Sequence, residues 1–132
     1  MKVKGLGGVF VKANDPEKLY SWYSEHLGLE RTPEGAFIVP TDRLMPEYTV
    51  VSFVPTNTSY LSPHSPCMLN FQVENLAQFM TSLANKGAKI DDHLEEGEYG
   101  RFGWVYDPEG NKVELWEPPP YDLSLIDLPE AE

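Results

Sequence analysis

The sequence predicts an α+β fold in which a strand–helix–strand–strand–strand unit occurs twice. Three observations lead to this prediction. The order of alternating and helically spaced apolar residues repeats with a period of roughly 60 residues. Of the 132 residues, 41% are hydrophobic and 12% aromatic, which is enough to fill the core of one domain. Each unit alone has too few strands to bury its own helix and sheet, so two units must pair, within one chain or between chains.

The first predicted unit begins with a strand at 8–13. Asp15 can cap the helix that follows, because an aspartate side chain accepts hydrogen bonds from the first free backbone amides. Apolar residues then recur at helical spacing, and Gly28 is a C-terminal stop signal. Two further strands, joined by a polar loop, are expected at 35–40 and 48–55.

The second predicted unit follows a polar, proline-containing linker at 56–66. It opens with a strand at 68–73, after which Asn75 can cap a helix and Gln78 completes a capping box. Gly87 ends this helix. The remaining strands are expected at 89–90, 102–106 and 112–116, the last two joined by the turn sequence Asp107-Pro-Glu-Gly110.

The charge balance excludes several classes of function. Lys and Arg total 10 against 21 Asp and Glu, which gives a formal net charge of −11 with neutral histidines. Nucleic acids and anionic membrane surfaces attract the opposite sign, so neither partner is expected. No apolar run reaches the roughly 18 residues of a membrane span, and the first residues lack a signal-peptide core. The single Cys67 cannot form an internal disulfide, and we expect a cytoplasmic protein.

Two stretches of sequence carry a family resemblance. The first is Val9-Phe-Val-Lys-Ala-Asn-Asp-Pro-Glu-Lys-Leu-Tyr-Ser-Trp-Tyr with Leu27-Gly-Leu29, and the second, more specific one is Asp107-Pro-Glu-Gly-Asn-Lys-Val-Glu-Leu-Trp116. Together they resemble the vicinal oxygen chelate superfamily, which includes glyoxalases, bleomycin-resistance proteins and extradiol dioxygenases.

This resemblance implies an architecture. It implies a single domain over 1–132 with βαβββ modules at about 5–57 and 66–118 and an acidic tail at 119–132. In such a domain, curved mixed sheets form an open cup with the helices outside. Family members work as dimers or as internally fused equivalents. A homodimer is therefore expected, and the apolar residues of the tail can dock on the body or on a partner.

The resemblance also implies a divalent-metal site, with His and Glu ligands on the first and last strands of each module. Gly8 and Met68 occupy the two first-strand positions, and neither is a normal ligand for such a metal. The last-strand glutamate is kept as Glu114, while the fourth position falls near Ser52 or Phe53. Because one ligand of four does not hold a metal, we predict no metal and no other cofactor.

A rearranged metal site stays open as an alternative. It would use His93 with Glu95 or Glu96, which lie close together in the sequence. The other histidines, His26 and His64, are interpreted as surface residues.

Strand parity predicts which side chains face the cup. One face of each strand is uniformly apolar and packs under the helices, whereas the other mixes aromatic and polar residues. A mixed face suits a ligand pocket, in which two tryptophans can enclose a planar or cationic ligand and Glu114 supplies charge. The predicted ligand-binding residues are Phe10, Asn70, Gln72, Trp104, Tyr106, Glu114 and Trp116.

The same side chains allow other interpretations. Aromatic residues are equally expected in a closed cup or a dimer interface. Glu114 can form a salt bridge with Lys12 or Arg101 instead of contacting a ligand. Arg101, just before the aromatic strand, is interpreted as a surface residue.

The sequence therefore predicts a small-molecule-binding protein of the glyoxalase/bleomycin-resistance type, without the family metal. The bleomycin-resistance branch binds a cationic drug in an acidic, aromatic groove and uses no metal. The alternative is a metal-dependent lyase, isomerase or dioxygenase, which needs a Lewis acid to bind vicinal oxygens. Metal-free acid–base catalysis is a third interpretation, with Glu114 as the one candidate catalytic group. Whether the protein is an enzyme stays open.

Overall fold

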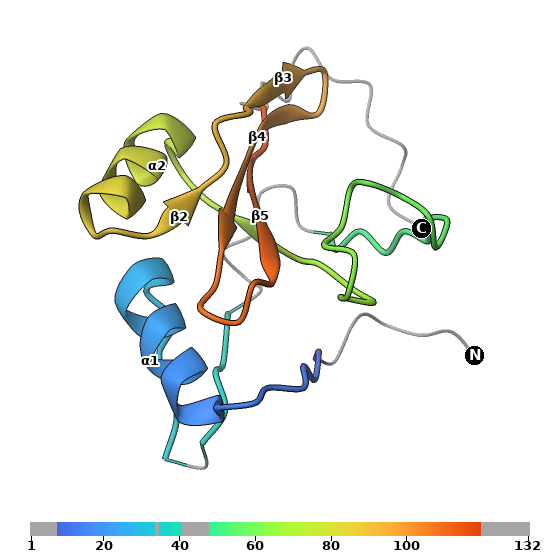
Figure 1. Cartoon of the computed structure of the whole chain (residues 1–132). Helices are drawn as coiled ribbons and strands as arrows, with labels where there is room; N and C mark the ends of the chain where they lie inside the picture. Colours follow the sequence, from blue (N-terminus) through green and yellow to red (C-terminus); the bar gives the residue numbers. More distant parts are fainter. Residues whose placement is uncertain (1–7, 34, 41–47, 120–132) are drawn as a thin grey trace, which may run out of the picture.

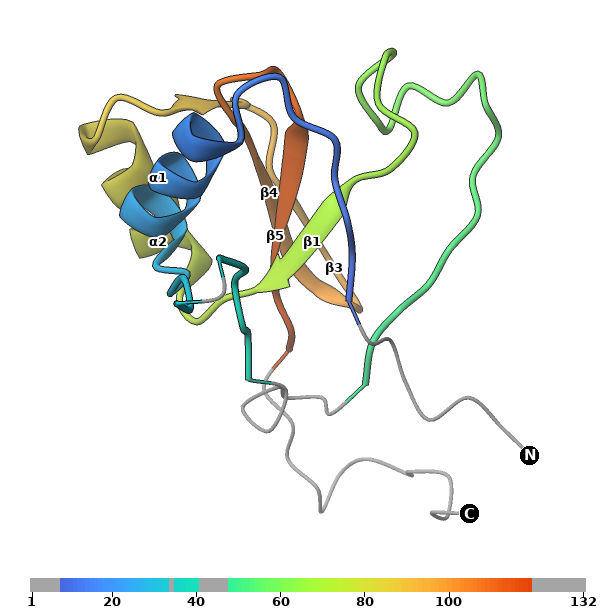
Figure 2. The same ribbon diagram turned by 90° about the horizontal axis from the view of Figure 1, so that it is seen from below.

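The computed structural model describes residues 8–33, 35–40 and 48–119. Two helices cover one face of a mixed β-sheet, and the chain at 48–66 runs on the other side (Figures 1 and 2). Neither helix has the length and apolar character that crossing a membrane requires, within the part of the chain described. The elements are α1 (Pro16–Leu27), β1 (Leu69–Gln72), α2 (Leu76–Asn85), β2 (Lys89–Ile90), β3 (Glu95–Gly97), β4 (Gly100–Tyr106) and β5 (Lys112–Glu117).

The sheet is built by the second half of the chain. Its strands lie in the order β1-β5-β4-β2, and β3 pairs with the first residues of β4. β1 runs parallel to β5, whereas β4 is antiparallel to all its neighbours. The predicted α+β class is confirmed, and the sheet is open. The elements predicted at 68–73, 89–90, 102–106 and 112–116 are present within a residue or two of their expected bounds.

Both helices begin and end where the sequence predicts. Asp15 Oδ1 accepts a hydrogen bond from Lys18 N at 3.2 Å and caps α1, which ends at Gly28 with φ of 74°. This left-handed conformation favours glycine. Asn75 Oδ1 caps α2 by accepting from Gln78 N at 3.3 Å.

The hydrophobic core lies between the helices and one face of the sheet. Leu83, Val105, Val113 and Leu115 are the largest fully buried side chains. Burial of each such side chain contributes roughly 1.5–3 kcal/mol relative to exposure. Residues of α1, α2, β4 and β5 share this core, so it joins the two halves of the chain. Its members are Leu19, Tyr23, Leu76, Met80, Leu83, Val105, Val113 and Leu115.

The first half differs from its prediction. Strands were expected at 8–13, 35–40 and 48–55, but the described residues of these segments form none. The pairing seen there is an isolated bridge between Arg31 and Phe37. Apolar alternation indicates that a segment can pair, whereas a strand also needs a neighbour for its backbone groups. The arrangement of two βαβββ modules around a cup therefore stays a prediction.

Large apolar side chains of these segments are exposed to solvent. Phe10 and Phe53 are 100% and 96% exposed, and several valines are about half exposed. The acidic tail predicted at 119–132 lies outside the described residues apart from residue 119, as do residues 5–7 of the first predicted module. The apolar residues exposed in this half are Val9, Phe10, Val11, Ile38, Val39, Tyr48, Val50, Val51, Phe53 and Val54.

Strand β3 has no counterpart in the prediction, because its three residues are exposed and show no apolar alternation. It pairs with β4 through a tight turn that ends at Gly100, which has φ of 114°. A β-carbon at this position would collide with the carbonyl oxygen of Glu117. Glycine is therefore required here both by its backbone conformation and by the close approach of β5.

Candidate ligand-binding site

The candidate site lies on the face of the sheet opposite the helices (Figure 2). Residues directly opposite each other in an antiparallel pair point to the same side of the sheet. Val105 is opposite Val113, and both belong to the buried core. The alternate positions of β4 and β5 carry the mixed aromatic and polar face, as strand parity predicts. Its cross-strand pairs are Phe102–Trp116, Trp104–Glu114 and Tyr106–Lys112.

Glu114 lies at the centre of this face and is 6% exposed. The Tyr60 hydroxyl donates a hydrogen bond to Oε1, and Asn70 Nδ2 donates to Oε2 at 2.5 Å. Burial, followed by the hydrogen bond to Glu114, raises the pKa of Tyr60, so this phenol stays protonated and acts as the donor. Within the described residues, no Lys, Arg or His nitrogen forms an ion pair with Glu114. The carboxylate is therefore buried among neutral donors.

Trp104 lies directly opposite Glu114 and is 2% exposed. The Tyr60 ring meets it edge-on with centroids 6.1 Å apart, and the His93 ring stacks on it at 5.6 Å. Lys112 Nζ lies 5.2 Å from the Trp104 ring centroid and 5.5 Å from that of Tyr60. The indole Nε1 interacts with the Tyr60 hydroxyl, and this contact acts to lower the pKa of Tyr60, but its geometry falls short of a hydrogen bond and no other partner lies in the described part of the chain. A buried donor without an acceptor is unusual, so an added acceptor would bind there favourably.

The ends of the face are formed by Trp116 and Tyr106. Trp116 stacks on Phe102 with centroids 6.2 Å apart, and its Nε1 donates to the Tyr99 carbonyl at 2.6 Å. The Tyr106 hydroxyl donates to Asp91 Oδ2 at 3.1 Å. Burial and this bond raise the pKa of Tyr106. Both aromatic residues are therefore held by partners other than Glu114.

The structure brings three predicted residues together: Asn70, Trp104 and Glu114. We call these three residues and Tyr60 the Glu114 cluster. Tyr60 belongs to the predicted linker and is not among the residues predicted for the site. The signal available for it was weak: a single aromatic residue within a polar, proline-containing segment. Its position depends on how the linker folds back over β5, which local sequence does not reveal.

Four predicted residues lie outside this cluster: Trp116 and Tyr106 at the ends of the face, and also Gln72 and Phe10. Gln72 is paired with Trp116 and so belongs to the end of the same face. Phe10 is fully exposed, because the segment at 8–13 is not paired with the sheet. The structure therefore does not bring Phe10 to Glu114, which corrects its predicted place in the cup. A role in ligand binding stays a prediction for the remaining residues.

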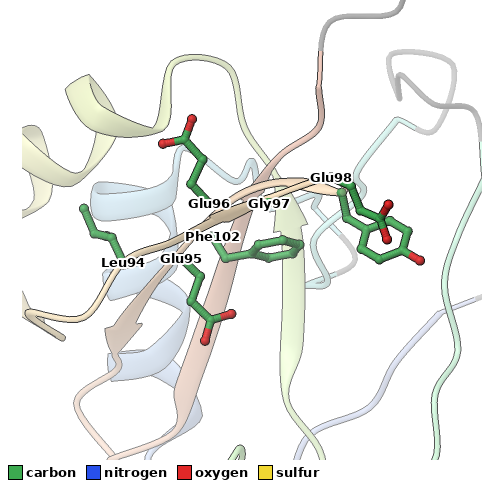
Figure 3. A pocket seen from close by; sticks show the side chains of 7 residues that line it. Leu94, Glu95, Glu96, Gly97, Glu98 and Phe102 are labelled. Carbon is green, nitrogen blue, oxygen red and sulfur yellow. The ribbon is translucent and has the colours of Figure 1, made fainter.

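A surface pocket adjoins the Trp116 end of the face. It has a volume of about 420 Å³ and lies along β3 and the start of β4 (Figure 3), and Glu114 is not among its lining residues. Its lining combines glutamates with exposed apolar side chains. Glu96 is paired with Arg101 at 3.4 Å. The lining residues are Leu94, Glu95, Glu96, Gly97, Glu98, Tyr99 and Phe102.

Comparison with protein families identifies the chain. The sequence profile of the Glyoxalase-like domain matches residues 8–116, which is most of the sequence. The chain belongs to this family. The vicinal oxygen chelate resemblance is thereby confirmed. A comparison with curated proteins finds no match.

Several solved structures share this fold. An integron cassette protein of V. cholerae is 18% identical, with a TM-score of 0.56 over 87% of this chain and 95% of that chain. A glyoxalase-related enzyme from Fulvimarina pelagi is 18% identical, with a TM-score of 0.55 over 89% and 90%. Lactoylglutathione lyase from Agrobacterium tumefaciens is 19% identical, with a TM-score of 0.51 over 86% and 96%. At these identities the likeness shows the fold alone.

The family resemblance implies a divalent metal, and the residues at the corresponding positions do not fit one. Gly8 offers no side-chain donor, and Met68 offers only a thioether, a poor ligand for hard divalent ions. Both oxygens of Glu114 already accept hydrogen bonds. No group of three or more His, Cys, Asp or Glu side chains is placed to hold a metal within the described ranges. The absence of a metal stays a prediction.

The structure shows the contacts of three charged residues for which other roles were considered: His93, Arg101 and Glu114. His93 Nε2 contacts Glu95 Oε1 at 3.1 Å, which places two residues of the rearranged metal site together, but no third ligand joins them among the residues that the structure describes. Arg101 pairs with Glu96 rather than with Glu114, in keeping with a surface position. The salt bridge considered for Glu114 is replaced by the bonds from Tyr60 and Asn70.

The glyoxalase-like motif at 107–116 consists of a turn that stabilises the fold and a strand that contributes to the candidate site. Asp107 is 5% exposed, and its carboxylate accepts hydrogen bonds from Tyr23 Oη at 2.9 Å and from Asn111 Nδ2 at 2.8 Å. The Glu109 carboxylate accepts from the backbone amides of residues 14 and 15, just before α1. The turn therefore attaches α1 to the sheet, and only the strand that follows it carries Glu114 to the site.

Proposed function

We propose that this protein binds a small aromatic molecule on the open face of its sheet, without a metal and with Glu114 at the centre. The observation that carries the proposal is the buried Glu114 carboxylate, which is surrounded by neutral donors. Burial of a charged group costs free energy unless hydrogen bonds compensate for it. A buried carboxylate can accept a hydrogen bond from a ligand more strongly than a carboxylate exposed to water.

The aromatic surroundings support the choice of ligand. Trp104 is next to Glu114, and its Nε1 is a buried donor without an acceptor in the described residues. Flat rings with a few directed polar groups are typical of small-molecule sites. Binding is favoured over metal-dependent catalysis because Glu114 is the one usual ligand at the family metal positions. The membership of this protein in the glyoxalase-like family supplies the fold for such a site. The single cysteine, Cys67, is free and exposed, which fits a reducing cytoplasm.

We also propose that the protein is a homodimer. The support is the set of exposed apolar side chains at 8–13 and 48–54. Exposed apolar residues are common singly, but here several follow one another in each segment. A second copy would cover them and supply the strand partners that these segments lack. Sedimentation equilibrium tests this proposal, and a monomer at every concentration would contradict it.

The ligand proposal is tested by Glu114→Gln. The probes are benzene derivatives with a hydroxyl, an amino or an aminomethyl group, titrated into ¹⁵N-labelled protein. We expect at least one probe to shift the indole resonance of Trp104 and the amides of β4 and β5. Glu114→Gln should weaken that probe by about 1–3 kcal/mol, the range for hydrogen bonds to a charged group.

The matched control is Glu74→Gln, which removes an exposed negative charge outside the site. It should leave the affinity unchanged. Circular dichroism checks that both variants are folded. If Glu114→Gln and Glu74→Gln bind the probe equally well, Glu114 is not part of the site. If no probe moves Trp104, the site itself is wrong.

A further inference from the structure

Tyr60 already occupies the position at which an aromatic ligand would meet Glu114. Its hydroxyl donates to Glu114 Oε1, its ring lies edge-on to Trp104, and Lys112 Nζ lies above its ring. These are a hydrogen bond, an aromatic contact and a cation–π contact on one phenol. Tyr60 is 38% exposed, whereas Glu114 and Trp104 are buried, so Tyr60 covers them from the solvent side.

The segment that carries Tyr60 is attached without strand pairing. Lys112 Nζ donates to the Tyr60 carbonyl at 3.0 Å, and Ser62 Oγ donates to the Gly110 carbonyl at 3.2 Å. Neither bond belongs to the ladder of the sheet, and the linker at 56–66 forms no strand. A segment held by a few polar contacts opens at lower free energy than a core strand. Tyr60 can therefore leave while β4 and β5 stay paired.

We propose that Tyr60 is an internal occupant of the site and that the ligand is a phenol that displaces it. This inference rests on the proposed function, because it concerns the same Glu114 cluster. The ligand ring takes the place of the Tyr60 ring beside Trp104 and beneath Lys112. Its hydroxyl donates to Glu114 as the Tyr60 hydroxyl does.

A free phenol can complete a hydrogen bond that Tyr60 makes only with poor geometry. A hydroxyl oxygen accepts as well as donates. Trp104 Nε1 lies near the Tyr60 hydroxyl without a hydrogen-bond acceptor in the described residues. A ligand that is not tethered to the backbone can shift until its oxygen accepts from this indole. That hydrogen bond favours the bound ligand over the Tyr60 side chain.

The position of Lys112 argues against a cationic ligand. Its ammonium group lies 5.2 Å from the Trp104 centroid and 5.5 Å from the Tyr60 centroid. The protein therefore supplies the cation of the cation–π contact, and the ligand supplies the ring. A cationic ring compound would place a like charge beside Lys112, which disfavours it.

The experiment compares three probes that differ by one group: 4-methylphenol, toluene and 4-methylbenzylammonium. Each is titrated into the wild type, Tyr60→Ala and Tyr60→Phe, with the Trp104 indole resonance as the readout. We expect 4-methylphenol to bind Tyr60→Ala at least about tenfold more tightly than the wild type, because the competing state is removed. Toluene should bind Tyr60→Ala about tenfold more weakly than 4-methylphenol, because it lacks the hydroxyl.

Tyr60→Phe keeps the ring and loses the hydroxyl, so its affinity for 4-methylphenol should lie between those of the wild type and Tyr60→Ala. It also serves if Tyr60→Ala does not fold. The control is Tyr99→Ala, which removes an exposed tyrosine at a different place and should leave the affinity at the wild-type value.

The outcomes separate this inference from the proposed function. Equal affinity of 4-methylphenol for the wild type and both Tyr60 variants would show that Tyr60 does not compete, and would overturn the inference. Tighter binding of 4-methylbenzylammonium than of 4-methylphenol would overturn the phenol class and leave aromatic binding at Glu114 standing. Failure of all three probes to move Trp104 in any variant would overturn both.

Discussion

Residues 69–117 contain α2 and all the paired strands of the described chain, whereas residues 8–55 contain α1 and one isolated bridge. The two regions have similar sequence patterns, since an apolar alternating segment precedes a capped helix in each. In the second region the alternating segments bury one face in the core. In the first, side chains of the same kind, such as Val51 and Phe53, are exposed.

The difference shows what a strand needs besides its own pattern. β4 and β5 are joined by a turn that Asp107 organises, since its Oδ1 accepts from the amides of Glu109 and Asn111 at 2.9 Å each. This local contact fixes the register of the hairpin, which costs little loop-closure entropy. β1 then adds to β5 over a connection that contains α2. The first region has a local turn too, in which the Gly35 amide donates to the Thr32 carbonyl and Arg31 comes opposite Phe37, but within the described residues the pairing does not extend beyond this bridge.

The same turn also connects the two regions, in addition to the shared hydrophobic core. Tyr23 of α1 donates to Asp107, and the carboxylate of Glu109 receives two amides from the start of α1. α1 therefore belongs to the packed body of the protein even though its flanking segments do not pair. Along the chain, the exposed apolar segments therefore lie on both sides of α1, while α1 itself packs in the core.

The largest expected effect compares two valines, one from each region. Val113→Ala should lower the free energy of unfolding by about 2–3 kcal/mol, because Val113 is 1% exposed and leaves a cavity. In the dissociated monomer, Val51→Ala should change it by less than about 0.5 kcal/mol, because Val51 is 63% exposed in the single chain. Urea unfolding measures both. A loss for Val51→Ala that appears at high protein concentration and shrinks on dilution would mean that a second copy buries this face, as the homodimer proposal expects. An equally large loss in the dilute monomer would remove the contrast between the regions.

A smaller effect is expected at the contact between the regions. Tyr23→Phe removes the hydrogen bond to Asp107, so we expect a loss of about 1–2 kcal/mol in the free energy of unfolding at neutral pH. Burial, followed by the charge of Asp107, raises the pKa of Tyr23 above its ordinary value near 10. The folded state therefore keeps the proton of Tyr23 at pH values where the unfolded chain loses it.

This shift makes the stability contribution of Tyr23 depend on pH. The contribution is complete below the unfolded pKa and is lost as the pH rises above it. The difference between the wild type and Tyr23→Phe should shrink by up to about 1.4 kcal/mol per pH unit above about pH 10. Urea midpoints of both proteins across this range provide the measurement. A difference that stays constant into strong alkali would show that Tyr23 does not carry the connection.

The sequence alone determined the local structure of this protein. The caps at Asp15 and Asn75, the stop at Gly28 and the turn at 107–110 are signals within a few residues of each other, and all four appear in the structure. Strand parity also separated the buried face of β4 and β5 from the face that carries Glu114, because side chains alternate along any extended strand.

Only the tertiary structure decided which segments pair and what surrounds Glu114. The pattern at 8–13 is compatible with a strand, yet this segment pairs with no strand in the described residues, and Phe10 is exposed. Tyr60 reaches Glu114 across 54 positions of the chain. Contacts at such separation depend on how the linker crosses the sheet, and a periodic pattern within one segment carries no information about that path.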